Sequence, residues 1–289
     1  MSPRIQRAAC LFAAMSLLAA VGCGPAGAPP ASAPPPTTAV APEAPAAPAA
    51  EATPEGAAAP EPSSGDELVI LCGTSFRPPT EKLVEMFQKE TGHTAVLSFG
   101  GSEELLPQVK LKAGGDLFIT HDPYMDKTEE FGAMLRWVRV GYLAPCLVVP
   151  KGNPKKIEKI EDLAKPGLQV LLNNPEYTTC GEMVMALLDK KGIKDQVLAN
   201  VGNAMFKHHS EIGTKLQLGF GDAGIMWNGV AHNFLDAVEV VPTPYEYDQE
   251  VRVGVIGLSF SQNQDRVEAF LKFAEQHGEK VFTEFGYVK

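Results

Sequence analysis

Two apolar segments of this chain each end in a turn of glycine and hydroxyl residues that leads straight into a helix. Residues 68–76 read LVILCGTSF, and residues 95–103 read AVLSFGGSE. Short apolar runs bounded by glycine are typical of buried strands, and strands that alternate with helices favour an α/β fold. The start of a helix leaves N–H donors unpaired and carries a partial positive charge, and glycine lets a ligand approach the backbone closely. The two turns therefore predict half of a binding site for an oxyanion.

The alternation of strands and helices continues along the chain. In its first part we expect strands at residues 68–72, 94–99 and 116–120 and helices at 80–91, 102–112 and 123–131. In its second part we expect strands at 168–172, 223–227 and 238–241, helices at 181–191, 194–201 and 210–218, and final helices at 265–277 and 279–285. Two long apolar stretches, 138–150 and 250–260, suit crossings between two lobes. This pattern predicts an α/β fold with a cleft and a hinge between the lobes.

The first 65 residues have the composition of an export signal and a tether. Residues 1–22 carry two arginines ahead of an apolar run, and residues 20–23 read AVGC, which resembles a bacterial lipoprotein cleavage box. Residues 23–65 are rich in Ala, Pro, Glu and Thr, so we expect a disordered tether. Lipidation of Cys23 would then hold the protein at a membrane, on its extracytoplasmic or periplasmic side. An ordinary cleaved signal, with Cys23 incidental, is the alternative.

Charge and cysteine content narrow the classes of partner. The net charge of −10 argues against nucleic acid. Cys72, Cys146 and Cys180 remain in the folded part, and an odd number cannot complete a disulfide framework. We expect a monomer without a cofactor or a bound metal.

Three features of the second lobe could also contribute to a binding site. Thr179 is followed by Glu182 in a capping-box spacing, which predicts a helix that starts at Cys180. His209 stands at the start of a further helix. Trp227 ends a strand and offers a single N–H donor, although it could equally be a packing residue.

Several motifs together identify a family resemblance. They are the turn at Ser75 and the segments 89–92 (KETG), 98–102 (SFGGS), 115–119 (GDLFI), 174–176 (NPE), 221–225 (GDAGI) and 285–287 (FGY). Over residues 67–288 the chain resembles the substrate-binding protein of molybdate ABC importers. Members of that family are two-lobed type II periplasmic binding proteins. The resemblance therefore implies a central, mainly parallel sheet in each lobe and a two-strand hinge. We expect lobe 1 to comprise residues 66–145 and 252–289, and lobe 2 residues 146–251.

The resemblance also implies a set of ligand-binding residues. Ser75 and Ser102 match serines that hold the oxyanion through hydroxyl and backbone N–H groups. Cys180 and His209 match positions that supply backbone N–H groups, and Trp227 stands where the family has a tyrosine hydroxyl. The predicted ligand-binding set is completed by Thr74, Thr179 and Arg77.

The function implied is capture of a tetrahedral oxyanion, molybdate or tungstate, for delivery to an ABC permease. The matched positions contain no carboxylate, which suits a fully deprotonated ion. Glu176, Glu103 and Asp122 are nevertheless close to them in sequence.

Two kinds of alternative remain open. The ligand could be a sulfate-like or phosphate-like anion, or a metal cation such as ferric iron. Candidate ligands for a cation are His121, Cys180, His208, His209, Tyr245 and Tyr247, whose spacing matches no compact metal motif. A hydrolase with Ser75 or Ser102 as nucleophile is disfavoured, because neither serine lies in a Gly-x-Ser-x-Gly motif.

Overall fold

The computed structural model describes residues 67–202 and 205–288, which lie within one compact unit. The predicted signal, Cys23 and the predicted tether lie outside the described residues. The described part is an α/β fold of two lobes, as the sequence predicted, and each lobe is built on its own sheet.

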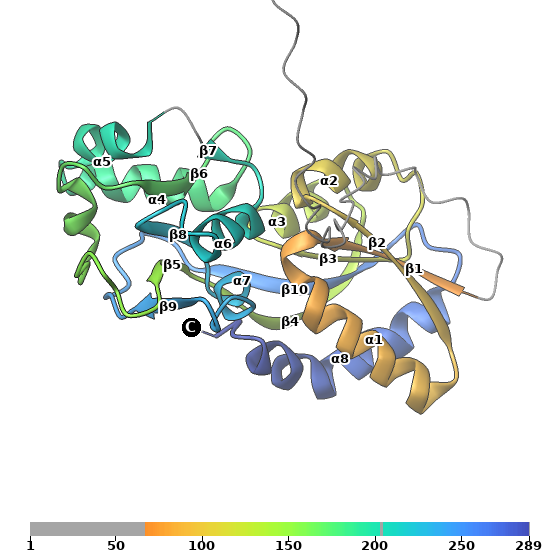
Figure 1. The fold of residues 1–289 in the computed structure, drawn as a ribbon. Coiled ribbons are helices and arrows are strands. Elements are labelled where there is room, and N and C mark those ends of the chain that lie inside the picture. Colours follow the sequence, from red (N-terminus) through yellow and green to blue (C-terminus); the bar gives the residue numbers. More distant parts are fainter. Residues whose placement is uncertain (1–66, 203–204, 289) are drawn as a thin grey trace, which may run out of the picture. The chain divides into compact units, whose positions relative to one another are not determined.

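The sheet of lobe 1 has five strands in the order β2-β1-β3-β10-β4 (Figure 1). Its members are β1 (Glu67–Gly73), β2 (Thr94–Gly100), β3 (Leu117–His121), β4 (Met134–Leu143) and β10 (Val251–Leu258). β1 pairs in parallel with β2 and β3, whereas β10 pairs antiparallel with β3 and β4. β10 is therefore the one reversed strand among the described strands of this sheet, which has two parallel and two antiparallel pairings.

The sheet of lobe 2 repeats this plan, with the order β7-β6-β8-β5-β9. Its members are β5 (Pro145–Pro150), β6 (Val170–Asn173), β7 (Met205–Phe206), β8 (Ala223–Trp227) and β9 (Val238–Val241). β6 pairs in parallel with β7 and β8, whereas β5 pairs antiparallel with β8 and β9. Here β5 is the reversed strand.

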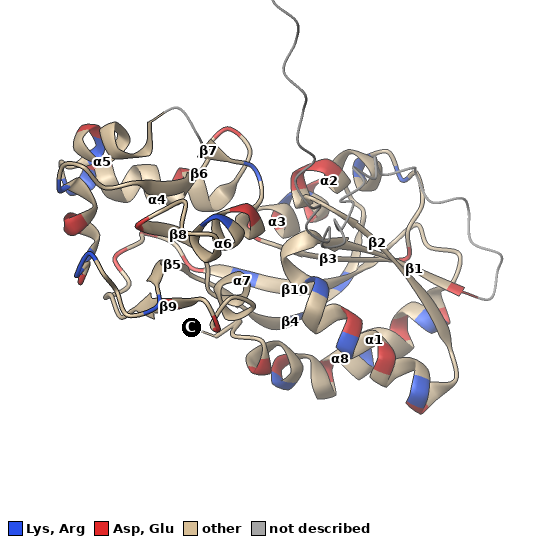
Figure 2. Ribbon diagram, viewed as in Figure 1, with Lys and Arg blue, Asp and Glu red and all other residues tan. Residues whose placement is uncertain are grey.

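Helices cover both faces of the lobe 1 sheet. α1 (Arg77–Thr91) and the long α8 (Gln264–Glu284) pack together on one face, and α2 (Ser102–Lys110) and α3 (Tyr124–Glu130) lie on the other (Figure 1). The alternation of side chains along a strand explains both layers. In β1, Leu68 and Ile70 enter the core beneath α1 and α8, while Val69 and Leu71 enter the core beneath α2. The outer surfaces of α1 and α8 carry charges of both signs (Figure 2).

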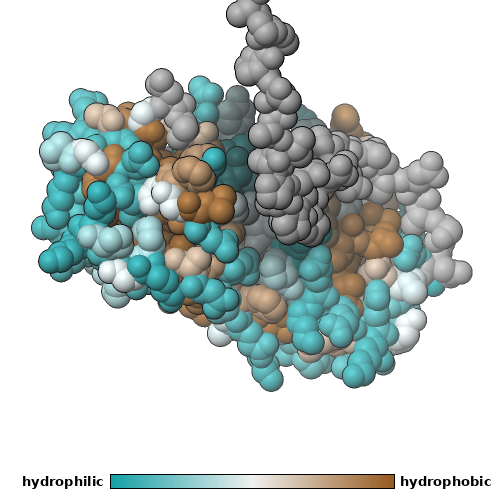
Figure 3. Space-filling model, viewed as in Figure 1, coloured by the Kyte–Doolittle hydropathy of each residue, from teal (hydrophilic) through white to brown (hydrophobic). Residues whose placement is uncertain are grey.

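The remaining described helices surround the lobe 2 sheet. They are α4 (Thr179–Lys190), α5 (Lys194–Val201), α6 (His209–Gln217), α7 (Asn228–His232) and the 3-10 turn η2 (Ile160–Ala164). A second 3-10 turn, η1 (Thr74–Phe76), links β1 to α1 in lobe 1. On the face seen in Figure 3, hydrophilic residues cover much of the described surface, with smaller hydrophobic patches between them. Within residues 67–202 and 205–288, no helix is both long and apolar enough to cross a bilayer.

Three chain segments connect the lobes. β4 continues into β5 through Ala144, and residues 242–250 return from β9 to β10. The C-terminal segment adds a third connection, because the Tyr142 amide donates to the Tyr287 carbonyl (3.0 Å) and the Asn228 side chain donates to the Val288 carbonyl (2.8 Å). The predicted lobe boundaries at residues 145 and 251 stay a prediction.

Several boundaries differ from those expected. The two final helices are a single helix, α8, and β10 lies wholly in the lobe 1 sheet, so residues 242–250 make the crossing. α1 begins at Arg77 rather than at residue 80, because Pro78 and Pro79 suit the first turn of a helix. The strand β7, the helix α7 and the turn η2 were not anticipated.

Candidate functional site

A small cavity lies where the helix starts of both lobes converge. Its volume is about 40 Å³. Since one water needs roughly 10–15 Å³ of such space, the cavity suits a ligand of a few heavy atoms. The lining residues are Gly73, Thr74, Ser75, Phe76, Gly101, Ser102, Glu103, His121 and Tyr124 from lobe 1, and Thr178, Thr179, Lys207, His208, His209 and Trp227 from lobe 2.

The structure brings most of the predicted site residues to this cavity. Those that line it are Thr74, Ser75, Ser102, Thr179, His209 and Trp227. The side chains of Cys180 and Arg77 are not part of the lining.

The two lobe 1 turns lie side by side because β1 and β2 end level with each other. Gly73 is paired with Gly100 in the register of the two strands. A Cβ atom at Gly73 would stand 3.0 Å from the Ser102 hydroxyl oxygen and 3.0 Å from the Phe76 ring. The Thr120 hydroxyl donates to Ser102 Oγ (2.9 Å), so the proton of Ser102 is free to be donated to a ligand.

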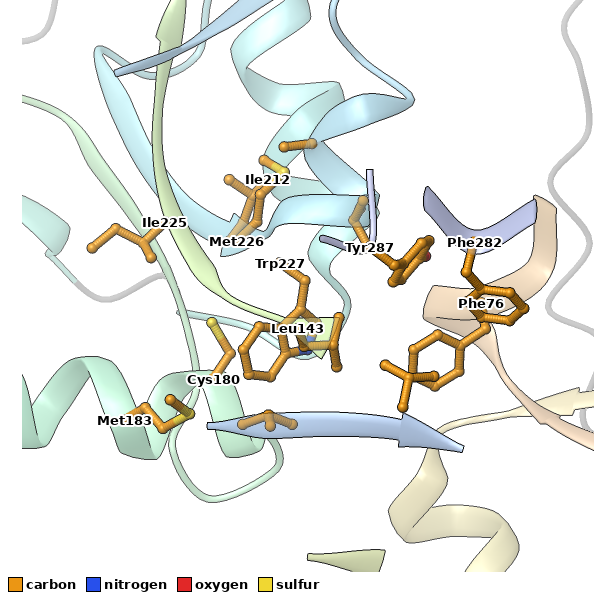
Figure 4. Packing of buried hydrophobic residues seen from close by; sticks show 14 of the residues in the cluster. Phe76, Leu143, Cys180, Met183, Ile212, Ile225, Met226, Trp227, Phe282 and Tyr287 are labelled. Atoms are coloured by element: carbon orange, nitrogen blue, oxygen red, sulfur yellow. The ribbon is translucent and has the colours of Figure 1, made fainter. Parts of the chain in front are cut away.

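A buried tyrosine holds the first turn from behind. The Tyr287 hydroxyl donates a hydrogen bond to the Ser75 carbonyl, and the Tyr287 ring packs against Phe76 with their centroids 5.7 Å apart (Figure 4). Burial raises the pKa of Tyr287, which keeps its hydroxyl a donor. This bond fixes the turn that carries Ser75, which lines the same cavity as Ser102.

Backbone amides at four helix starts remain available in the described part of the chain. Within residues 67–202 and 205–288, no turn, cap or side-chain hydrogen bond has the amides of Ser75, Ser102, Thr179, Cys180 and His209 as its donors. Because the first turn of a helix has no intrahelical acceptor for these groups, they are natural donors to an anion.

Other amides in the same turns are already occupied. The Gly101 amide donates to the Glu104 carboxylate (2.8 Å), and the Gly181 amide donates to the Thr178 hydroxyl (3.0 Å). The cap of α4 is therefore Thr178 and not Thr179, and α4 begins one residue before the predicted Cys180. This shift frees the Thr179 hydroxyl from the cap, and Thr179 lines the cavity together with Tyr124 of lobe 1.

In lobe 2, the stacked rings of His209 and Trp227 form one wall. Their centroids are 5.5 Å apart. The Trp227 amide donates to His209 Nδ1 (3.4 Å), which leaves the proton on Nε2 as a donor. Burial lowers the pKa of His209 to about 3, so the ring is neutral near pH 7.

Cys180 and Arg77 occupy other environments. The Cys180 side chain is fully buried beside Trp227 in the core of lobe 2 (Figure 4), and burial raises its pKa. Only its backbone amide belongs to the start of α4. The Arg77 guanidinium lies 3.7 Å from the centroid of the Phe99 ring and pairs with Glu81 (3.5 Å).

Sequence reasoning missed several lining residues. Tyr124 follows the end of β3, so it stands at the same sheet edge as the turns after β1 and β2. The carboxyl ends of parallel strands meet at one edge, and this rule could have identified Tyr124. Lys207 pairs with Glu104 across the lobes, and nothing in its local sequence marks it.

The alternative sites proposed from the sequence are not assembled. Ser102 Oγ is hydrogen-bonded to the Thr120 hydroxyl, and no hydrogen bond in the described residues joins it to a histidine. Tyr245 and Tyr247 contact each other, with ring centroids 5.4 Å apart, and neither lines the cavity. Within the described residues no three His, Cys, Asp or Glu side chains are grouped as a metal-binding set.

Comparison with known proteins finds relatives and similar folds. The Molybdate-binding protein ModA of Mycobacterium tuberculosis is 26% identical over 181 residues, which cover 61% of this chain and 67% of the relative. The periplasmic molybdate-binding protein of Azotobacter vinelandii has a TM-score of 0.63 at 18% identity, covering 77% of this chain and 99% of its own.

Other solved structures share the fold but are named for other ligands. The sulfate-binding protein SubI of Mycobacterium tuberculosis has a TM-score of 0.64 at 18% identity, covering 76% and 86% of the two chains. Iron-bound HitA of Pseudomonas aeruginosa has a TM-score of 0.61 at 15% identity, covering 75% and 84%.

A family model described as "Bacterial extracellular solute-binding protein" matches residues 68–288, which is nearly the whole of the described region. That family consists of binding proteins, and the two lobes with a small cavity between them agree with it. The chain belongs to the bacterial extracellular solute-binding proteins.

Proposed function

We propose that this protein is the receptor of an ABC importer, and that it captures a small tetrahedral oxyanion between its lobes for delivery to the permease. The observation that carries the proposal is the convergence of helix starts from both lobes on one cavity of about 40 Å³. Their unpaired amides and nearby hydroxyls offer hydrogen-bond donors on several sides of a ligand.

The number of donors is sufficient for tight binding. A hydrogen bond to a charged group contributes roughly 1.5–3 kcal/mol, and nanomolar affinity corresponds to about −12 kcal/mol. Five to seven good donors are therefore required on this estimate. No single turn supplies that many, and the donors come from both lobes, so the bound ion should favour the closed arrangement of the lobes.

The electrostatic character of the cavity suits an anion held by dipoles. His209 is neutral, and Lys207 is engaged by Glu104. Recognition then depends on amides and hydroxyls at short range rather than on a fixed countercharge. Two of the relatives described above are named for molybdate and one for sulfate, so the proposal covers tetrahedral oxyanions as a class, molybdate and tungstate among them.

The proposal includes the cellular setting predicted from the sequence. The protein would act as a monomer on the extracytoplasmic side, anchored through a lipid on Cys23, and the tether would give the lobes reach towards the permease. Cys23 and the tether lie outside the described residues.

Titration calorimetry with molybdate, tungstate, sulfate, phosphate and ferric iron tests this function. We expect at least one oxyanion to bind, and we expect Ser75→Ala and Ser102→Ala each to weaken that binding about tenfold or more, because one charge-assisted hydrogen bond is lost. Binding of iron with no response to any oxyanion would refute the proposal. Unchanged oxyanion affinity in both variants would remove the two serines from the site.

A further inference from the structure

Two hydrogen-bond acceptors lie in the lining of a cavity that otherwise consists mainly of donors. One is the carboxylate of Glu103, and the other is the imidazole of His121. Fully deprotonated oxyanions offer acceptors only, so neither group could form a hydrogen bond with such an ion.

The Glu103 carboxylate folds back over the start of α2. A Cβ atom built at Gly101 would collide with Glu103 Oε1, and the same carboxylate accepts the amide of its own residue. This position is open only because residue 101 is glycine. The carboxylate therefore occupies the turn that also presents the Ser102 hydroxyl to the cavity.

The neighbours of Glu103 do not neutralise it directly. Lys207 approaches from lobe 2, but its ammonium pairs with the carboxylate of Glu104. Burial raises the pKa of Glu103, and Glu104 adds to this rise, while Lys207 and His208 act weakly in the opposite direction. A hydroxyl donor on the ligand would therefore stabilise the charge of the Glu103 carboxylate.

His121 is held in the tautomer that presents an acceptor. Its Nδ1 lies 2.6 Å from the Asp122 carbonyl, which can only accept, so Nδ1 carries the proton. Burial lowers the pKa of His121 to about 4, which keeps the ring neutral and leaves the lone pair on Nε2. His209 has the opposite tautomer, because its Nδ1 accepts the Trp227 amide. The two histidines thus offer one acceptor and one donor to the same cavity.

We propose that the Glu103 carboxylate accepts a hydrogen bond from the protonated oxygen of the bound ligand, so that the site selects tetrahedral oxyanions that keep a hydroxyl group near neutral pH, such as hydrogen phosphate, over ions of similar shape that are fully deprotonated. This inference rests on the proposed function, because it takes the cavity to be an oxyanion site. It makes Glu103 a specificity-determining residue, and His121 Nε2 a second acceptor for the same proton or for a hydroxyl of an organic phosphate.

Glu104 provides a matched control on the same helix. It is the adjacent carboxylate, it does not line the cavity, and its oxygens are taken by Lys207 and by the Gly101 amide (2.8 Å). Glu103→Gln and Glu104→Gln each remove one negative charge from the start of α2, so any effect of overall charge or of the helix terminus is common to both.

The experiment is calorimetry of the ligand-free protein with potassium phosphate, sodium sulfate and sodium molybdate at pH 7.5, on the wild type and both variants. We expect the wild type to bind phosphate at least tenfold more tightly than sulfate or molybdate. Glu103→Gln should weaken phosphate binding tenfold or more and strengthen binding of the other two ions. Glu104→Gln should leave the ratio of phosphate affinity to sulfate or molybdate affinity within about twofold of the wild-type ratio. Should Glu103→Gln fail to fold, as judged by its circular dichroism melt, Glu103→Ala takes its place.

Two outcomes separate this inference from the proposed function. If the wild type binds sulfate or molybdate tightly and Glu103→Gln leaves the ratio of affinities unchanged, the role of Glu103 is wrong and the oxyanion receptor stands. If none of the three ions nor tungstate binds the wild type, both the receptor function and this inference fail.

Discussion

Gly73 determines how closely the two turns of lobe 1 approach each other. Any side chain at this position would meet the Ser102 hydroxyl and the Phe76 ring at 3.0 Å. Such a contact is tighter than side chains normally make in a packed interior. The absence of a Cβ atom is therefore what lets one ion contact the Ser75 and Ser102 turns together.

Gly73→Ala should weaken oxyanion binding by about tenfold, because the added methyl group displaces the Ser102 hydroxyl, and should lower the free energy of unfolding by about 1–3 kcal/mol. Calorimetry and urea denaturation measure the two effects. Gly100→Ala is the matched control, since it occupies the paired position in β2 but its Cβ would have the buried Leu105 side chain as its nearest neighbour, at 3.1 Å. Equal losses of affinity in both variants would contradict this role for Gly73.

The two buried histidines predict how stability depends on pH. Burial lowers the pKa of His121 to about 4 and that of His209 to about 3, from 6.5 in each case. Below pH 6.5 the unfolded chain therefore binds more protons than the folded protein. The free energy of unfolding should fall as pH is lowered from 6.5 towards 4, by roughly 1 kcal/mol per pH unit for each imidazole.

Urea denaturation between pH 4 and 7 measures that slope. His121→Gln and His209→Gln should each flatten it, whereas His277→Gln, which lies in α8 away from the cavity, should not. An unchanged slope in both cavity variants would show that these rings are not buried and neutral.

At the scale of elements, the start of α4 shows how a cap and a binding group divide their roles. Thr178 has extended backbone angles and its hydroxyl accepts the Gly181 amide, which is the geometry of an N-cap. Thr179, one residue later, is inside the helix and contacts Tyr124 instead. Both threonines thus line the cavity, but only Thr178 caps the helix.

Thr178→Ala should lower the free energy of unfolding by about 1 kcal/mol, because the Gly181 amide loses its acceptor. Thr179→Ala should cost less stability than Thr178→Ala while weakening ligand binding. Thermal denaturation measures the loss of stability in each variant, and calorimetry measures the loss of ligand affinity. A larger loss of stability in Thr179→Ala than in Thr178→Ala would restore Thr179 as the cap.

At the scale of the whole molecule, the contacts between lobes govern access to the cavity. Lys207, between β7 and α6, pairs with Glu104 of α2, and Tyr124 of α3 meets Thr179 of α4. On the opposite side the C-terminal segment joins the lobes through Tyr287 and Asn228. The first group of contacts would break on opening, whereas the second lies at the strands that connect the lobes.

Lys207→Met should weaken ligand binding by up to about fivefold, because an exposed ion pair contributes roughly 0.2–1 kcal/mol to the closed arrangement. The difference from the wild type should shrink in 0.5 M salt, as expected for screened charges. Lys194→Met is the control, since Lys194 pairs with Asp189 within lobe 2 (2.7 Å). Calorimetry of both lysine variants at two salt concentrations tests the role of the Lys207–Glu104 pair. Equal changes of ligand affinity in the two variants would contradict that role.

The local sequence pattern was enough to predict the positions of the strands and of most helix starts. β1 is a short apolar run that is buried along almost its whole length, and the Gly–hydroxyl turns after β1 and β2 were placed at the correct residues. The N-cap of α4 was misplaced by one position because Thr178 and Thr179 are both capable caps, and only the Gly181 amide distinguishes them. The single helix α8 was divided at Gly278, which is tolerated there because Val140 packs against it.

The sequence by itself determined the α/β fold, its two lobes and the turns that carry Ser75 and Ser102, because these follow from hydrophobic period and glycine placement along the chain. Only the tertiary structure decided that Glu103, Tyr124 and Lys207 belong to the same cavity and that the side chains of Cys180 and Arg77 do not. Those outcomes depend on distances between elements far apart in sequence, and strand order and side-chain packing, rather than local pattern, set such distances.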